Sequence, residues 1–286
     1  MEPTLLQILF LGLVQGAAEL LPVSSSAHVI VAEKLMGLEA GSPAMTFLLV
    51  MLHTGTMFAV ILYFWKAWKR TFFADAQSLR TTAVNVGTAT LVTLAVGFGL
   101  KLLLEKVILR GTSHDEMEDL FGHLPSVGAA LLTAGILILA AGYLRGKNGR
   151  KEIGLSSSLW IGASQGLCLP FRGLSRSGTT ISTGMLLGLG RQRVEEFSFA
   201  LAVVITPPAI GKELLRLLKS HGAQTAPADL LHLLGPGLFG MAGAFVAGLL
   251  ALKLLSSWLE KGHWAWFGWY CVAFAGFVFF LASRGY

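Results

Sequence analysis

Long apolar runs without charged residues recur along the 286-residue chain. A helix that crosses the hydrocarbon core of a bilayer needs about 20 mostly apolar residues. Several runs meet this length: Phe47–Trp65, Thr81–Leu100, Leu124–Leu144, Leu230–Leu252 and Trp264–Ser283. A further run, Phe197–Gly211, is shorter, but Lys212 can extend its stem to the interface. The pattern predicts an all-α polytopic membrane protein with about six transmembrane helices.

Two other apolar regions are interrupted by charge near their middle. One covers residues 3–32 and is interrupted by Glu19, and the other covers residues 153–190 and is interrupted by Arg172 and Arg176. A helix broken in this way is tolerated in a membrane only where its backbone lines a cavity or packs against protein. We therefore expect two re-entrant helical hairpins. The alternatives are a pair of amphipathic surface helices and, at the start of the first region, a cleaved signal peptide.

The two interrupted regions resemble each other in sequence. A Gly-x-x-Gln-Gly segment begins at Gly12 and again at Gly162, an offset of 150 residues. Each copy continues through a proline into a serine-rich turn and is followed by a phenylalanine-rich span. Repeats of inverted topology with broken helices at the midplane are typical of membrane proteins of this kind. We expect one membrane domain, 1–286, with inverted halves 1–144 and 153–286.

Composition excludes two classes of protein. Only 13% of the residues are charged, 54% are hydrophobic and the mean hydropathy is +0.67, whereas a soluble domain carries about 25% charged residues. A water-soluble globule and a disordered chain are therefore ruled out. The net charge of +6 agrees with basic cytoplasmic loops rather than with a nucleic-acid partner. The two cysteines lie in apolar runs, which disfavours a disulfide framework or a thiolate metal cluster.

Loop charges predict the orientation in the membrane. The loop after the first span is basic, the next is acidic and the third, residues 145–152, is basic. Cytoplasmic loops carry the excess of Lys and Arg, so this alternation predicts inside, outside and inside, with both termini outside. The mildly basic segment 212–219 departs from the rule. Tryptophans gather at membrane interfaces, so we assign five of them to interface belts: Trp65, Trp68, Trp264, Trp266 and Trp269.

The two breaks carry chemistry suited to phosphate. The first offers a carboxylate, three hydroxyls and an imidazole: Glu19, Ser24, Ser25, Ser26 and His28. The second offers two guanidinium groups, two hydroxyls and a glycine: Arg172, Arg176, Ser175, Ser177 and Gly178. Ionisable groups inside a membrane cost roughly 2.5–3.5 kcal/mol each on insertion scales, so they are candidates for function. Arginine and helix starts bind phosphate, a carboxylate with substrate phosphates holds Mg²⁺, and a serine with a histidine supplies nucleophile and base.

Each candidate also has a structural interpretation. Glu19 can pair with Arg176 to hold the hairpins together, and the serines can cap the following helices. His28 can be a hydrogen-bonded packing residue. His53, midway along a span, is expected to bond a neighbouring helix, with a supporting role at the site as the alternative. Two glutamines are candidates either for substrate contact or for hydrogen bonds between helices: Gln15 and Gln165.

Two segments have a recognisable sequence. Glu19–His28 reads Glu-Leu-Leu-Pro-Val-Ser-Ser-Ser-Ala-His, and Ser175–Ile181 reads Ser-Arg-Ser-Gly-Thr-Thr-Ile. They resemble the two signatures of the undecaprenyl-diphosphate phosphatase family, the integral membrane phosphatases linked to bacitracin resistance. The likeness covers essentially the whole chain, including Glu-Phe-Ser-Phe from Glu196. It implies inverted repeats with two re-entrant hairpins.

The resemblance also implies an activity, which is removal of the terminal phosphate from a C55 polyprenyl diphosphate to supply the lipid carrier of bacterial cell-wall (peptidoglycan) synthesis. It implies a divalent cation, Mg²⁺ or Ca²⁺, with Glu19 as its ligand. The expected location is the bacterial cytoplasmic (inner) membrane. The expected partners are the polyprenyl diphosphate lipid and the bilayer, without nucleic acid, and a homodimer is a candidate assembly.

The chain departs from the family pattern in two places. The family often has an acidic residue at the position of Gln15, so this chain has a single carboxylate in the first motif. The family's second signature is usually Pro-Gly-x-Ser-Arg-Ser-Gly. From Pro170 this chain reads Pro-Phe-Arg-Gly-Leu-Ser-Arg-Ser-Gly, which is longer and one charge richer. Arg172 is therefore a candidate second phosphate ligand.

The expected reaction is hydrolysis of a lipid diphosphate. Arg176 and a cation at Glu19 neutralise the diphosphate. Ser25 or Ser26 is the expected nucleophile with His28 as base, and attack by His28 itself or by an activated water is the alternative. A polyprenyl-phosphate transporter or flippase is the rival function, because broken helices at the midplane are also typical of transporters. A nucleophile beside a base favours the enzyme.

Overall fold

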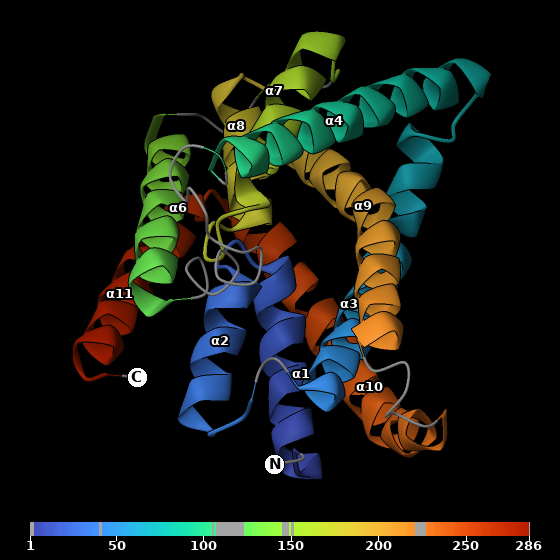
Figure 1. Ribbon diagram of the computed structural model, residues 1–286. Coiled ribbons are helices and arrows are strands. Elements are labelled where there is room, and N and C mark those ends of the chain that lie inside the picture. The colour runs from blue at the N-terminus through green and yellow to red at the C-terminus, as the bar shows by residue number, and fades with distance from the viewer. Residues whose placement is uncertain are drawn as a thin grey trace.

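The computed structural model describes residues 3–39, 42–104, 106, 123–144, 149, 152–220 and 227–285, with only the backbone of 43, 216–220 and 227–233. Within these residues the chain is helical and has no β-strand (Figure 1). The helices are α1 (Leu5–Leu20), α2 (Ser25–Leu35), α3 (Pro43–Thr71), α4 (Ala76–Leu103), α6 (Leu124–Leu144), α7 (Leu155–Cys168), α8 (Arg176–Leu186), α9 (Arg191–Ser220), α10 (Pro227–Lys261) and α11 (Trp264–Ser283). The predicted all-α class is confirmed.

Six helices in the described part of the chain are long and apolar enough to cross a membrane. They lie in α3, α4, α6, α9, α10 and α11, and each contains one of the predicted spans. The largest difference is in α9, which begins at Arg191 and runs to Ser220, so the predicted span 197–211 is only its central part. Pro207 and Pro208 lie inside this helix. Neighbouring helices allow prolines within membrane helices by satisfying the freed backbone groups.

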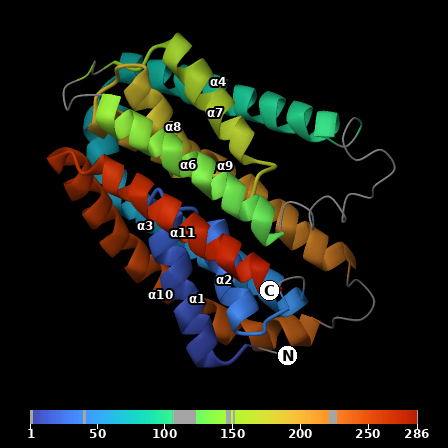
Figure 2. The same cartoon turned by 90° about the vertical axis from the view of Figure 1, so that its left-hand side faces the viewer.

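Both interrupted regions are broken helices, as the charges predict. The first break separates α1 from α2 after Leu20, and the second separates α7 from α8 after Cys168. In both views the pair α1–α2 lies on one side of the middle of the molecule and the pair α7–α8 on the other (Figures 1 and 2). Their insertion from opposite sides of a bilayer, the inverted repeat and the two halves stay predictions.

Small residues allow the broken helices to approach their neighbours closely. The main helix pairs are α1 with α10, α3 with α10, α4 with α7 and α6 with α11. A Cβ atom at Gly12 would lie 2.7 Å from a backbone carbonyl of α10, and one at Gly16 would overlap another. Gly162 and Gly166 meet α4 in the same way. Small residues at such positions promote helix association in lipid, so both Gly-x-x-Gln-Gly segments are packing motifs.

The tryptophans divide between surface and interior. Three are about half exposed, as expected for an interface belt: Trp65, Trp266 and Trp269. Trp264 is fully buried and donates its indole N–H to Ser182 Oγ over 3.1 Å. Trp68 is also buried and donates to the carbonyl of Glu196 over 3.1 Å. The assignment to interface belts is therefore wrong for Trp68 and Trp264, whose N–H groups bond to the protein interior.

The charged loops are described only in part. Lys69 and Arg70 lie in the last turn of α3, where cations complement the helix dipole. Most charges of the second and third loops, within 105–122 and 145–151, lie outside the described residues. The position of both termini outside the cell membrane therefore stays a prediction.

Candidate active site

The turns of the two broken helices line a cavity of about 240 Å³. Eight of the candidate residues line it: Glu19, Ser24, Ser25, Ser26, Arg172, Ser175, Arg176 and Ser177. Four others do not: Gln15, His28, Gln165 and Gly178. Two segments about 150 residues apart in sequence thus form one polar cavity.

Hydrogen bonds join the two turns directly. The backbone N–H of Gly173 donates to Ser26 Oγ over 3.1 Å, and Ser177 Oγ donates to the carbonyl of Leu21 over 3.2 Å. Ser177 is buried. Ser26 and Ser177 therefore hold the two turns together in addition to lining the cavity.

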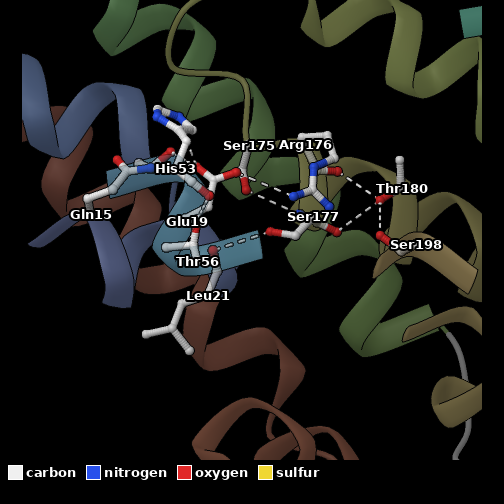
Figure 3. A network of polar contacts seen from close by, with 12 residues as sticks. Gln15, Glu19, Leu21, His53, Thr56, Ser175, Arg176, Ser177, Thr180 and Ser198 are labelled. Atoms are coloured by element: carbon white, nitrogen blue, oxygen red, sulfur yellow. Dashed lines mark hydrogen bonds and ion pairs between the residues drawn. The ribbon is translucent and has the colours of Figure 1, made fainter. Parts of the chain in front are cut away.

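Glu19 is the centre of the polar network in Figure 3. Its Oε2 accepts hydrogen bonds from Ser25 Oγ (2.5 Å) and Gln15 Nε2 (3.1 Å), and Arg176 Nη2 donates to Oε1 over 3.4 Å. His53 Nε2 lies 3.8 Å from Oε2. The Glu19 side chain is 19% exposed, so water screens these contacts only partly. The expected ion pair with Arg176 is present, and the same carboxylate also accepts a hydrogen bond from the hydroxyl of Ser25.

The serine turn contains an unusual backbone conformation. Ser24 has a φ angle of 68°, and no other non-glycine residue among those described has a positive φ. Residues with a Cβ atom rarely adopt this region. Ser24 Oγ caps α2 by accepting from the N–H of Ala27 over 3.4 Å, so the predicted capping role is confirmed here. The turn places Ser25 and Ser26 at the start of α2, where unpaired backbone N–H groups favour an anion.

The hydrogen bonds of His28 do not lead to the serines that it is expected to activate. Its Nδ1 lies 2.8 Å from the carbonyl oxygen of Ser24, and its Nε2 lies 2.7 Å from the hydroxyl of Tyr270 on α11. The ring stacks on Phe274 with 4.0 Å between centroids. These contacts form a hydrogen-bonded packing environment, and the role of His28 as a base stays a prediction.

Arg176 is the first residue of α8 and is held on several sides. Its guanidinium carbon lies 5.7 Å from the ring centre of Phe199, and its carbonyl accepts from Thr180 Oγ1 over 2.8 Å. Its Nη1 is buried and has no hydrogen-bond partner within the described chain. A buried donor without a partner costs free energy that a bound acceptor would remove. The arginine fork suits phosphate oxygens, and Arg176 lines the cavity, so its guanidinium is suited to an anionic ligand there.

The other predicted residues of the second turn differ in their surroundings. Arg172 is exposed and lines the cavity, so its guanidinium is accessible to a ligand there. Ser175 Oγ accepts from the N–H of Gly178 over 3.1 Å and caps α8. A Cβ atom at Gly178 would lie 2.8 Å from Ile138 Cδ1 and 3.0 Å from Ser175 Oγ, so this glycine allows close packing against both side chains. Among the predicted binding residues of this turn, Arg172 therefore has the most accessible side chain.

The two glutamines have different partners. Gln15 Nε2 donates to Glu19, whereas Gln165 Nε2 donates to Thr93 Oγ1 of α4 over 3.2 Å. Both glutamines are 1% exposed, and neither lines the cavity. Direct substrate contact is therefore wrong for Gln165, which is buried between α7 and α4 and joins them. Gln15 acts on the site through Glu19, because its side chain is also buried.

The donor set for a metal is small. No group of three or more His, Cys, Asp or Glu side chains suited to a metal occurs among the described residues. Glu19 lines the cavity, and its Oε2 lies 3.8 Å from Nε2 of His53, which does not line it. His53 Nδ1 lies 2.8 Å from the carbonyl of Leu49, so its N–H is on Nδ1 and Nε2 carries a lone pair. A carboxylate has about four lone-pair directions and three receive protein donors, so one cation contact fits.

The sequence offered a supporting role at the site only as the alternative for His53, and nothing in it indicated Tyr270. His53 lies on α3 and Tyr270 on α11, each within a long apolar run. The polar residues beside His53, including Thr54 and Thr56, are the only local signal, because a polar group inside a span needs a partner. A contact over such sequence distances is set by helix packing.

The chain matches the family described as bacitracin resistance protein BacA over residues 8–277. It is 56% identical over 281 residues to undecaprenyl-diphosphatase 2 of Acinetobacter baylyi, with 97% of this chain and 98% of that protein covered. The undecaprenyl-diphosphatase of Desulfosudis oleivorans is 35% identical, with 99% of this chain and 100% of that protein covered. That of Bacteroides fragilis is 32% identical, with 97% and 98% covered. The similarity therefore includes both broken helices.

Proposed function

The chain belongs to the bacitracin resistance protein BacA family, and we propose that it is a membrane phosphatase that hydrolyses undecaprenyl diphosphate. The products are undecaprenyl phosphate, the lipid carrier of cell-wall synthesis, and inorganic phosphate. The observation that carries the proposal is that Arg176 lines the cavity in which Ser25 donates a hydrogen bond to Glu19. An anion-binding donor, a hydroxyl and an acceptor for its proton are the groups that phosphoryl transfer to a serine requires.

The second turn binds the diphosphate. Arg176 contacts the phosphoryl group that is transferred, and Arg172 contacts the phosphate that stays with the lipid. The first residues of α2 and α8 both line the cavity, so the positive ends of two helix dipoles face the ligand. Positioning and charge stabilisation of this kind provide most of the catalysis in phosphoryl transfer.

The first turn supplies the nucleophile. Ser25 Oγ attacks the terminal phosphorus, its proton passes to Glu19 over the 2.5 Å hydrogen bond, and the bond from phosphorus to the bridging oxygen breaks. Undecaprenyl phosphate leaves with the bridging oxygen. Water then attacks the phosphorus of the phosphoserine, and the bond from phosphorus to Ser25 Oγ breaks. The hydroxide part of the water stays on the phosphorus in the released inorganic phosphate, and the proton of the water goes to Ser25 Oγ. Glu19 releases its own proton to solvent. Ser26 is less suited to attack, because its hydroxyl already accepts from Gly173.

The proposal includes a divalent cation, Mg²⁺ or Ca²⁺. Glu19 would hold it, with His53 Nε2 as the nearest further donor and with phosphate oxygens and water as the remaining ligands. When bound, the cation neutralises phosphate charge. Mn²⁺ binding to the purified protein without substrate, followed by electron paramagnetic resonance, tests this. We expect at least about tenfold weaker binding in Glu19→Gln. Equal binding in wild type and Glu19→Gln would remove Glu19 as the ligand.

The activity is tested by phosphate release from undecaprenyl diphosphate with detergent-purified protein, where transport has no meaning. We expect release by the wild type, at least about a 1,000-fold loss in Ser25→Ala and less than about a tenfold loss in Ser26→Ala. A labelled terminal phosphate is expected to be trapped on the serine of the wild type. A folded wild type that releases no phosphate would overturn the proposed function and favour the transporter. A reversed order of the two variants would make Ser26 the nucleophile.

The proposed location is the bacterial cytoplasmic membrane, with both termini outside. It is supported by the six candidate spans and by the alternation of loop charges. A cysteine placed at Lys147 is expected to react with impermeant reagents from the inside only. Labelling at this position from outside alone would overturn the orientation.

A further inference from the structure

The ring of His28 is fixed in one protonation pattern by its neighbours. The carbonyl oxygen of Ser24, 2.8 Å from Nδ1, can only accept, so the ring proton is on Nδ1. Nε2 of the neutral ring therefore carries the lone pair, and the hydroxyl of Tyr270 donates to it over 2.7 Å. Both nitrogens have a partner, and neither partner is a serine hydroxyl. No lone pair of the neutral ring remains for the proton of Ser25.

The partner of Nδ1 is the residue with the unusual backbone. Ser24, with φ 68° and ψ 96°, directly precedes Ser25. Its carbonyl accepts both from His28 Nδ1 and, over 3.3 Å, from the backbone N–H of His28. A sparsely populated conformation persists only when the surroundings stabilise it. The ring thus stabilises the peptide that orients Ser25.

Three residues of α11 contact the serine turn or the first turn of α2, which follows it. Tyr270, 242 residues from His28, bonds the ring, and the next residue, Cys271, directs its Sγ to the carbonyl of Pro22 over 3.4 Å. Phe274, one turn further along α11, stacks on His28. The position of the serine turn is therefore coupled to a helix that contributes no residue to the cavity lining.

We propose that Tyr270 is a positioning residue for the phosphatase reaction and that it acts through His28, whose role is to hold the serine turn. The proton of Ser25 goes to Glu19, which lies 2.5 Å from the hydroxyl. This inference rests on the proposed function and assigns to His28 a task other than that of general base.

Two substitutions of His28 separate holding from proton abstraction. The amide nitrogen of asparagine lies about where Nδ1 does and can donate to the Ser24 carbonyl, whereas that of glutamine lies about where Nε2 does. Neither amide takes up a proton near neutral pH. We expect kcat of His28→Asn to stay within about tenfold of wild type and that of His28→Gln to fall about 100-fold. Losses above about 1,000-fold in both variants, with thermal unfolding unchanged, would overturn the proposal and make His28 the base.

Tyr270→Phe removes the hydroxyl and keeps the ring. We expect kcat to fall about three- to tenfold with KM unchanged, which is the effect of one lost hydrogen bond on orientation. Tyr143→Phe is the control, because the Tyr143 hydroxyl also has one partner, Trp269, away from the cavity. Wild-type kcat in Tyr270→Phe would overturn the role of Tyr270.

Nitrogen NMR of ¹⁵N-histidine protein provides a readout that does not depend on activity. The His28 signals, identified by their loss in His28→Gln, are expected to show the Nδ1–H form in both the wild type and Tyr270→Phe, because the Ser24 carbonyl holds the proton on Nδ1 in both. The Nε2 signal is expected to shift in Tyr270→Phe, because its hydrogen bond from the hydroxyl is lost. An Nε2–H form in the wild type would overturn the inference. If the wild type has the Nδ1–H form but releases no phosphate, the proposed function fails and the ring assignment stands.

Discussion

The two broken helices begin with the same Gly-x-x-Gln-Gly segment, but their glutamines have different tasks. Gln15 in α1 donates to Glu19, whereas Gln165 in α7 donates to Thr93 of a neighbouring helix. The residue four positions after the glutamine makes the difference, because it is Glu19 in the first segment and Leu169 in the second. Residues four apart on a helix face each other. The same amide is therefore part of the active site in one helix and a packing residue in the other.

The turns that follow are also specialised. The first carries the acid and the hydroxyl, and the second carries the guanidinium groups. Neither turn is a phosphate site alone, since the ion pair of Glu19 with Arg176 and the hydrogen bond of Gly173 to Ser26 connect them. Similar segments in the two broken helices thus form the scaffold, and a few residues that differ between them supply the chemistry.

Removal of the acid is expected to have the largest effect. Glu19→Gln should lower kcat at least about 1,000-fold, because the proton acceptor of Ser25 and the charge beside Arg176 are lost together. Phosphate release in detergent measures it. Glu39→Gln, on an exposed position after α2, is the control and should leave kcat unchanged. More than a tenth of the wild-type rate in Glu19→Gln would show that the first turn does not carry the acid.

The two arginines of the second turn should separate in kinetics. Arg176→Ala is expected to lower both kcat and kcat/KM about 100-fold, because the contact strengthens as charge develops on the transferred phosphoryl. Arg176→Lys should restore little of the lost kcat, since the ammonium of lysine is a point charge without the paired N–H donors of a guanidinium. Arg172→Ala should raise KM about tenfold at nearly constant kcat, as expected for uniform binding. Near wild-type turnover in Arg176→Ala would show that Arg176 does not contact the transferred phosphoryl group, and Arg172 would then be the candidate for that contact.

The shared packing role of the glycines should appear as a loss of stability of similar size in both halves. Gly16→Val and Gly166→Val each place a side chain against a neighbouring helix, so each should lower the free energy of unfolding by about 1–3 kcal/mol. Gly99→Val is the control, because nothing lies within 4 Å of a Cβ atom there. Thermal unfolding in detergent measures the change. A clear difference between Gly16 and Gly166 would contradict a common packing motif.

The smallest expected effects distinguish the two glutamines. Gln15→Leu should lower kcat about tenfold with little change in stability, because it removes one hydrogen bond from the Glu19 carboxylate. Gln165→Leu should keep kcat within about twofold and lower the free energy of unfolding by about 1 kcal/mol, the usual size of an interhelical hydrogen bond in lipid. Kinetics and thermal unfolding of both variants are required. A loss of stability in Gln15→Leu together with a loss of kcat in Gln165→Leu would contradict the roles assigned to the two glutamines.

Most of the fold and part of the site could be predicted from the sequence. The six spans and two breaks follow from the length of apolar runs and from charges that cannot lie in hydrocarbon, and both are local properties. The free-energy cost of placing a charge in hydrocarbon also identified Glu19 and Arg176 as candidate site residues. The ends of α9 were not predictable, because its first turn carries charged residues that only protein contacts can accommodate, such as Glu196 beside Arg193.

The order of apolar and charged residues is sufficient to predict which segments are helical, where two of them break and which charged groups need a partner in the membrane. The tertiary structure decided the partners. It placed Tyr270 on His28 and Glu19 on Ser25, and it buried Trp264 although its neighbours face outward. The physical reason is that hydrocarbon and protein interior select the same apolar residues, so the sequence does not distinguish a lipid-facing side chain from a buried one. Hydrogen bonds between helices far apart in sequence form only once packing has set their distances.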